Sequence, residues 1–337
     1  MGNVDRRRIY IKRATHISIQ SPMSESWMRE PRLTRESYVR SEDPQFREWL
    51  NPMESRRLSN ILKRALVTAI KVKRDSGIEQ PEAVITGTGL GCIENTELFL
   101  NQLCREGEEL LKPTYFMQST HNTVSSLIGI NGKIHGYNST YSHKGVSFDS
   151  ALMDAIVQMR LGDINNALVT GNDEITPTYF SILKRSGYVG QEGQVPAGEA
   201  SVAMMLTTDA EDTLCEIEDF NMVYRKENIG EDTLNTAGPV DAILMGLSGE
   251  RSNDEAYRDI EGKLPKAPIL RYKHLFGESY TASGLGVYAA AQMLKEGTVP
   301  AVMRVDGGEP IEGVRRIFVV NHSDGREYTF LTMRRAE

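Results

Sequence analysis

Apolar and polar residues recur along the chain with two periods, and this predicts a mixed α/β protein. Short apolar runs bounded by Gly, Pro, Asn or Asp are typical of buried strands, whereas apolar positions three or four residues apart indicate helices. The predicted strands cover 8–19, 81–91, 163–171, 200–207, 215–223, 242–246, 317–321 and 328–333. The predicted helices cover 54–73, 96–111, 122–130 and 280–294.

Helices and strands alternate in both parts of the chain. The helix at 54–73 places Leu58, Ile61, Leu62, Leu66 and Ile70 on one face. The helix at 280–294 is apolar and rich in Ala and Gly, which suits burial on several sides. This alternation favours a layered α/β fold over an all-helical or all-strand one.

Composition narrows the class of protein. The chain has 337 residues, of which 39% are hydrophobic and 25% charged, and its net charge is -7. These values fit a globular protein and give no overall footprint for nucleic acid. No apolar run is long enough to span a bilayer, so no membrane span is expected.

The cysteines indicate the compartment. Three widely spaced cysteines, Cys92, Cys104 and Cys215, form no CxxC pattern and fit reduced thiols in a cytoplasmic protein. We therefore expect neither a metal site nor a cofactor.

A glycine-rich turn follows the strand at 81–91. Gly87, Gly89 and Gly91 read GxGxG rather than the GxGxxG of dinucleotide-binding proteins, and no acidic ribose ligand ends a next strand. The pattern favours a tight strand-to-helix turn over a nucleotide site.

The segment 141–155 is the most informative one for function. It predicts the end of a buried strand, a tight elbow and the start of a buried helix, with Gly145 at the elbow. Other short motifs follow in a fixed order: Gly87–Gly91, Gly162-Asp163 with 167–171, Gly198–Ser201, Gly249 with Asn253-Asp254, and Lys273–Gly284.

In this order the motifs resemble those of the β-ketoacyl synthase family, which has the thiolase fold, over most of the chain. The resemblance implies an αβαβα five-layer sandwich of two similar halves, 1–210 and 211–337. It also implies a dimer formed through elements beside the elbow.

The resemblance also assigns the catalytic positions. Counting back from Gly162-Asp163 places the family's nucleophilic cysteine at Gly145, and its two histidines fall on Gly246 and Glu278. The family's lysine is matched by Lys273. Ser147 lies about 200° round the helix from the elbow and faces elsewhere. No member of the Cys-His-His set is therefore intact.

A carboxylate at 278 opposes the family's chemistry. The histidines donate hydrogen bonds to charge that develops as a malonyl group loses CO₂, and an ionised carboxylate cannot donate. At ~4 Å from a developing enolate it would cost about 4 kcal/mol at an effective dielectric of roughly 20. Lys273 is expected to pair with Glu278 instead. The family's acyl-gating loop is also replaced, by 321–328.

Three functions remain open. The chain resembles a chain-length-factor-like partner of an active β-ketoacyl-ACP synthase in fatty-acid or polyketide biosynthesis, as a heterodimer or homodimer, with acyl carrier protein as a possible further partner. The elbow sequence Ser142-His143-Lys144-Gly145 is similar to that of aryl-polyene or flexirubin-type pathway subunits.

The first alternative is a divergent acyltransferase or β-ketoacyl synthase with a rebuilt site around His143, Lys273 and Glu278, to which His121 is a further candidate. The second is a module that binds an acyl chain or carrier protein. An active synthase aligned differently would need Cys92 or Cys104 in the pocket.

Overall fold

The computed structural model describes residues 7–108, 111–235 and 238–336, and its main feature is one mixed ten-stranded sheet. The spatial order is β10-β9-β13-β14-β8-β1-β7-β5-β3-β4. The first five strands in sequence are β1 (Ile9–Ile17), β3 (Ala83–Gly87), β4 (Tyr137–Tyr141), β5 (Asn166–Asp173) and β7 (Ala200–Thr207). The other five are β8 (Cys215–Tyr224), β9 (Ala242–Met245), β10 (Ile269–Arg271), β13 (Arg316–Ser323) and β14 (Glu327–Arg335).

The same strand arrangement occurs twice. Each half of the sheet has five strands, which we number 1 to 5 in chain order. From the outer edge to the centre, the order in both halves is 3-2-4-5-1. Strand 1 of each half, β1 and β8, pair antiparallel at the centre. In each half the first two neighbour pairs from the outer edge are parallel and the next two are antiparallel. The proposed division at residues 210 and 211 falls in the connection between β7 and β8.

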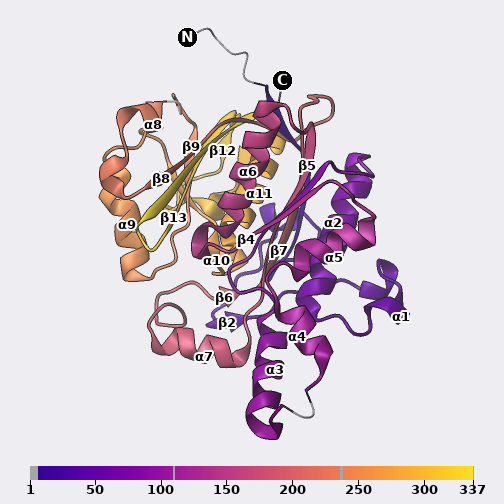
Figure 1. Ribbon diagram of the computed structural model, residues 1–337. Helices are drawn as coiled ribbons and strands as arrows, with labels where there is room; N and C mark the ends of the chain where they lie inside the picture. Colours follow the sequence, from indigo (N-terminus) through magenta and orange to yellow (C-terminus); the bar gives the residue numbers. More distant parts are fainter. Residues whose placement is uncertain (1–6, 109–110, 236–237, 337) are drawn as a thin grey trace.

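Helices complete five layers (Figure 1). Helices α6 (Ser147–Leu161) and α11 (Ala282–Glu296) lie between the two halves of the sheet. The outer layers are α2 (Asn60–Ser76) with α5 (Thr123–Gly132) on one side and α9 (Arg251–Glu261) on the other. The predicted thiolase-like αβαβα sandwich is confirmed.

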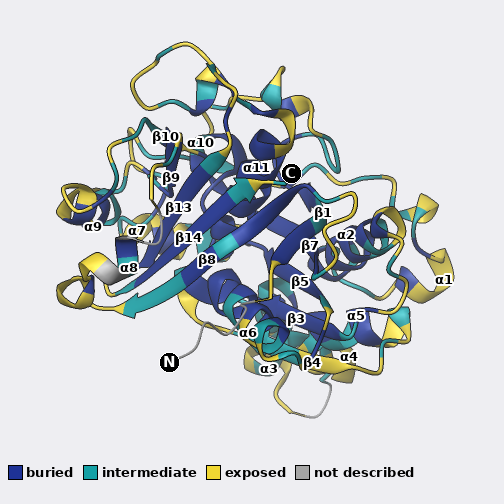
Figure 2. Cartoon of the chain, turned by 90° about the horizontal axis from the view of Figure 1, so that it is seen from above, coloured by how far each residue is buried: buried dark blue, intermediate teal, exposed yellow. Residues whose placement is uncertain are grey.

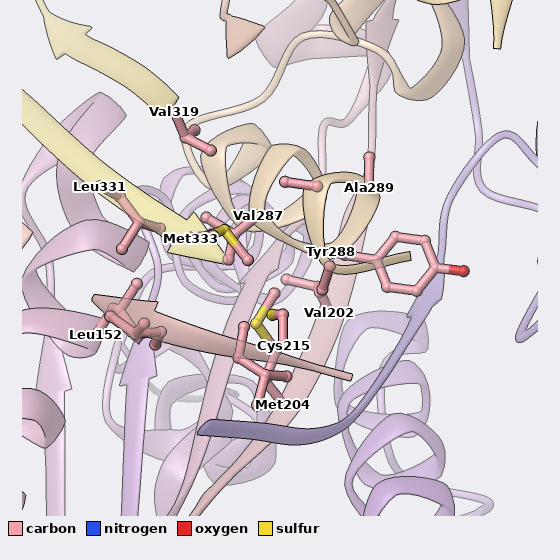
Figure 3. Close-up of a cluster of buried hydrophobic side chains, with 14 of the residues drawn as sticks. Leu152, Val202, Met204, Cys215, Val287, Tyr288, Ala289, Val319, Leu331 and Met333 are labelled. Atoms are coloured by element: carbon pink, nitrogen blue, oxygen red, sulfur yellow. The ribbon is translucent and has the colours of Figure 1, made fainter. Parts of the chain in front are cut away.

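Side-chain alternation explains how each strand serves two layers. In β13, Ile317 and Val319 belong to the central core, while Phe318 and Val320 pack with the outer helix α9. Successive strand residues face opposite sides, so a strand covered on both sides must be apolar throughout. The central core gathers Leu152 of α6, Val287 of α11 and strand residues of both halves (Figure 3).

Small residues let the central helices approach closely. A Cβ at Gly284 of α11 would lie 2.6 Å from Val202 and 2.9 Å from Phe148 of α6. The glycine content of α11 is thus a packing requirement. Figure 2 shows the resulting contrast between buried strands and exposed outer helix faces.

Most of the remaining elements are short. They are β2 (Tyr38–Val39) with β6 (Ala197–Gly198), β11 (Thr298–Val299) with β12 (Ile311–Glu312), α1 (Pro52–Ser55), α3 (Ile93–Glu106), α4 (Pro113–Ser119), α7 (Pro177–Arg185), α8 (Glu231–Asn235) and α10 (Lys273–Phe276). Short 3-10 turns occupy Ser26–Met28, Phe46–Glu48, Lys144–Val146, Lys226–Asn228 and Ala301–Met303.

Two helices differ from the sequence prediction. The helix predicted at 54–73 is two helices, α1 and α2, and the one predicted at 96–111 ends at Glu106, with 109–110 outside the described residues. Within the described ranges, no helix combines the length and apolar character needed to cross a membrane.

Candidate functional site

The elbow lies where β4 leads into α6, and its backbone is held by local hydrogen bonds. Lys144 has a φ of +45°, a left-handed conformation that is uncommon for a residue with a side chain. Ser147 Oγ donates to the Lys144 carbonyl at 2.7 Å and accepts from the His143 N–H at 2.8 Å. Ser147 is therefore buried and occupied as a structural group.

Gly145 stands at the tip of this elbow, beside the hairpin of β13 and β14. Its carbonyl accepts from Asn321 Nδ2 at 2.9 Å. A Cβ placed on Gly145 would approach the His322 carbonyl at 3.3 Å and Ser323 Oγ at 3.6 Å. A Cβ at this position needs its neighbours to shift by a few tenths of an ångström, which is less than at the tightest glycines of the fold.

A buried carboxyl supports the elbow from below. Asp149 of α6 accepts from Asn321 Nδ2 at 3.0 Å and from Thr329 Oγ1 at 2.8 Å. Burial raises the pKa of Asp149, and the hydrogen bonds act in the opposite direction. Asn321 thereby links the elbow carbonyl to α6 and fixes where Gly145 lies.

The predicted pair of Lys273 and Glu278 forms. Lys273 Nζ donates to Glu278 Oε2 at 2.7 Å, and both side chains are almost fully buried. Burial raises the pKa of Glu278, while the charge and hydrogen bond of Lys273 lower it. The Glu278 backbone N–H donates to the Pro196 carbonyl, and its carbonyl accepts from the Gly198 N–H.

Gly246 lies against this pair at the end of β9. A Cβ here would be 2.6 Å from Tyr257 Oη, 3.0 Å from Lys273 Cε and 3.1 Å from Tyr272 Oη. Contacts under 3.0 Å require something to move, and both tyrosines are fully buried. The space that a histidine side chain would need is occupied.

His322 is a site residue that the sequence prediction did not single out. Its Nδ1 accepts from the Gly325 N–H at 3.3 Å, so Nε2 carries the proton and donates to the Asn253 carbonyl at 2.9 Å. Burial, together with the charge of Lys273, lowers the pKa of His322 to about 4. The departure of 321–328 from the family's loop was the available signal, but it did not indicate which side chain turns inward.

These residues enclose a cavity of about 170 Å³. The cavity is lined by Gly145, Tyr188, Glu250, Ser252, Asn253, Lys273, Glu278, Ser279, Tyr280, Ser283, Asn321, His322, Ser323 and Asp324. Three predicted positions, Gly145, Lys273 and Glu278, are therefore brought together, with Gly246 packed directly behind the lysine.

His143 is not brought to this group. Its side chain is 48% exposed, with Nδ1 3.3 Å from Ser150 Oγ and Nε2 3.9 Å from Glu327 Oε1. His121 is also exposed, beside Gly91. Neither imidazole lines the cavity.

The cysteines lie elsewhere as well. Cys92 is buried before α3, Cys215 is buried in β8, and Cys104 is exposed on α3. None lines the cavity.

The glycine-rich turn is occupied by a carboxylate of the protein itself. Asp173 accepts from the N–H groups of Gly89 and Leu90 at 2.8 to 3.0 Å, and from Thr88 Oγ1 at 3.2 Å. These N–H groups are the donors a bound phosphate would use. The turn therefore has a structural role.

Comparison with solved structures shows several similar folds. The ishigamide ketosynthase/chain length factor matches with a TM-score of 0.78 and 18% identity over 98% of this chain and 99% of that chain. A ketosynthase (ApeO) in complex with its chain length factor (ApeC) from Xenorhabdus doucetiae gives 0.74 and 14%, covering 100% of both chains. A type II PKS acyl-carrier protein in complex with its ketosynthase (AntDE:AntF) gives 0.78 and 13% over 98% and 99%.

A search of curated protein sequences gave no match. The family model for the beta-ketoacyl synthase N-terminal domain matches residues 25–246, which is most of the chain. With this match and the five-layer fold, the chain belongs to the β-ketoacyl synthase family.

Proposed function

We propose that this protein is a non-catalytic ketosynthase-like subunit that pairs with an active β-ketoacyl-ACP synthase, as a chain length factor does. The observation that carries the proposal is Gly145, which presents no side chain to the cavity at the elbow. Covalent acyl transfer needs a nucleophile at that place.

The surroundings of Gly145 support the same conclusion. The two positions that the family fills with imidazole hold a glycine without free space and a carboxyl paired with Lys273. The one imidazole in the cavity, His322, uses both ring nitrogens in hydrogen bonds to backbone. It is therefore neither a free base nor a free donor to an enolate.

The surface beside the elbow supports a protein partner. β4 is the outermost strand of its half of the sheet, and such an edge presents unpaired backbone groups. Large apolar side chains are exposed on β4 and on α5 and α6, which both contact it: Tyr137, Ile130, Val157 and Leu161. Phe116 and Met117 of α4, a helix that contacts α5, are exposed as well.

We refer to these six residues as the β4 surface. An obligate partner would bury about 2,000–5,000 Å². Two of the similar structures are described as ketosynthase with chain length factor, and a third as a ketosynthase with an acyl carrier protein. A heterodimer that is served by a carrier protein is therefore our proposal for the assembly.

The proposal is tested by purifying the chain alone and together with a co-expressed ketosynthase from the same pathway. Alone, it should gain no acyl mass when incubated with acyl thioesters, and should not condense malonyl units. Together, the two chains should elute as a 1:1 complex in which the ketosynthase carries the acyl group. An acylated chain, or condensation by the chain alone, would show that the proposal is wrong.

One observation favours a rebuilt catalytic site. Glu278 lines the cavity, and burial raises the pKa of its carboxyl, as in many general acids. Thioester hydrolysis that is lost in Glu278→Gln but kept in Glu250→Gln, at the cavity rim, would support that alternative.

A further inference from the structure

A second concave site lies on the outer helix layer, between α2 and α5, which run side by side (Figure 1). We call it the α2–α5 groove; its volume is about 350 Å³, and none of its lining residues belongs to the elbow cavity. It is lined by Leu66, Ala69, Ile70, Lys73, Arg74, Glu79, Gln80, Ile128, Asn131, Gly132 and Lys133. The groove therefore has a polar rim and an apolar floor, of which Ile70 is half-buried and the other residues are buried in the core.

The rim carries more positive than negative charge. Lys73, Arg74 and Lys133 face a single acidic residue, Glu79. Arg74 is held in place, because its guanidinium lies 4.7 Å from the Trp49 ring and 3.3 Å from Asp75. Lys73 and Lys133 are therefore the rim cations that could bind a ligand.

Lys73 is the unusual member of this set. Its side chain is half-buried, and burial lowers the pKa of its ammonium group, against the favourable charge of Glu79. Within the described part of the chain, no carboxylate lies at ion-pair distance from Lys73. The nearby Asp75 pairs with Lys71 and Arg74 instead. The ammonium lies across Gly132, 3.1 Å from where a Cβ would stand.

A partly desolvated ammonium beside an apolar floor is complementary to an anionic amphiphile. Removing a cation from water is costly unless an opposite charge offsets it. A carboxylate above Lys73 would add to the charge of Glu79, and a hydrocarbon chain would cover Ile70, the apolar lining residue that is not already buried. The groove volume lies within the range of small-molecule sites, roughly 300–1,000 Å³.

We propose that the α2–α5 groove binds a medium-chain fatty carboxylate, with its head at Lys73 and Lys133 and its chain on the apolar floor. The site is separate from the elbow cavity and does not depend on the proposed partner role. Binding at this site requires both the carboxylate and the hydrocarbon chain of the ligand.

The test is a calorimetric titration of the full chain with sodium decanoate below its critical micelle concentration. Decanol and acetate, which carry the chain alone and the carboxylate alone, are titrated in parallel. The variants are Lys73→Gln and, as a matched control, Lys71→Gln, which removes a lysine of the same helix outside the groove. A thermal melt of each variant confirms that it is folded.

We expect one decanoate per chain, at least tenfold weaker binding of decanol and acetate, and about tenfold weaker decanoate binding in Lys73→Gln. Lys71→Gln should bind as the unmodified chain does. Equal binding of decanol, equal binding of acetate, or equal losses in the two variants would each overturn the proposal. If Lys73→Gln does not fold, Lys133→Gln takes its place, with the same expected loss.

Discussion

At the scale of single residues, the two glycines at the site are glycine for different reasons. Gly246 has no room for a Cβ, because Tyr257 Oη would lie 2.6 Å away, whereas Gly145 leaves 3.3 Å to its nearest neighbour. The first is set by packing. The second is less tightly constrained, because a Cβ there needs its neighbours to shift by only a few tenths of an ångström.

This difference predicts opposite tolerance to alanine. Gly145→Ala should change the free energy of unfolding by less than about 1 kcal/mol, whereas Gly246→Ala should lose about 1–3 kcal/mol through overpacking. Urea unfolding of the two variants measures both values. Equal losses would mean that the elbow is packed as tightly as the lysine site.

A buried carboxyl outside the cavity should contribute to the response to pH. Glu174, directly after β5, accepts from the Glu94 N–H at 3.1 Å and lies near Glu199 and Arg64. Burial raises the pKa of Glu174 from 4.5 to about 8, and the nearby carboxylates act in the same direction. At neutral pH the folded state therefore keeps this carboxyl protonated.

The sign of the pH effect follows from that raised pKa. Between pH 4.5 and about 8 the folded state binds a proton that the unfolded state has lost, so stability falls as pH rises through this range. Glu174→Gln mimics the protonated form and should lack this loss. At pH 8 the variant should be more stable than the unmodified chain by at least about 1 kcal/mol.

Urea unfolding at several pH values between 5 and 8.5 measures the difference. Glu54→Gln, which removes an exposed carboxyl, serves as the control and should leave the slope unchanged. Parallel curves for Glu174→Gln and the unmodified chain would contradict the assignment.

At the scale of elements, the buried strands and central helices were predictable from sequence. β7 is buried along its whole length and α11 from Ala282 to Leu294, and both are mostly apolar, so their type and burial follow from composition. The polar helix α9 was missed because only Ala256, Tyr257 and Ile260 of its eleven residues are buried. Its apolar stripe is too narrow to separate from a loop.

Element boundaries depended on contacts that the sequence does not display. α2 begins at Asn60 rather than near residue 54, and it carries a buried Arg64 that pairs with Glu199 at 2.8 Å. These two residues are 135 positions apart. From the sequence alone, a charged residue within an apolar helix face is predicted to be exposed, because its buried partner is not known.

Contacts that the sequence does not display also decide which side chains line the site. Lys273 and Glu278 are five residues apart, and the pair was predicted from that spacing. His322 enters the cavity from the end of β13. His143 points away from the cavity, because the elbow directs its side chain toward Ser150. Both directions are set by tertiary packing, which a spacing rule does not contain.

At the scale of the whole molecule, the β4 surface is the feature that the fold leaves without a cover. Exposed side chains there include Ile130 at 75% and Leu161 at 72%, on helices that flank the edge strand. Exposed apolar residues beside an open edge favour association and, without a partner, aggregation. The proposed heterodimer would bury both.

Charges placed on this surface should therefore weaken pairing without unfolding the chain. Ile130→Glu with Leu161→Glu should weaken the complex with the ketosynthase at least tenfold, because each carboxylate would be buried unpaired in the interface. Ile182→Glu is the matched control, since Ile182 is 56% exposed on α7, outside the β4 surface. Analytical ultracentrifugation of the co-purified chains gives the association, and circular dichroism the fold. A complex that survives the double variant but not Ile182→Glu would move the interface to α7, because buried charge weakens only the surface that the partner covers.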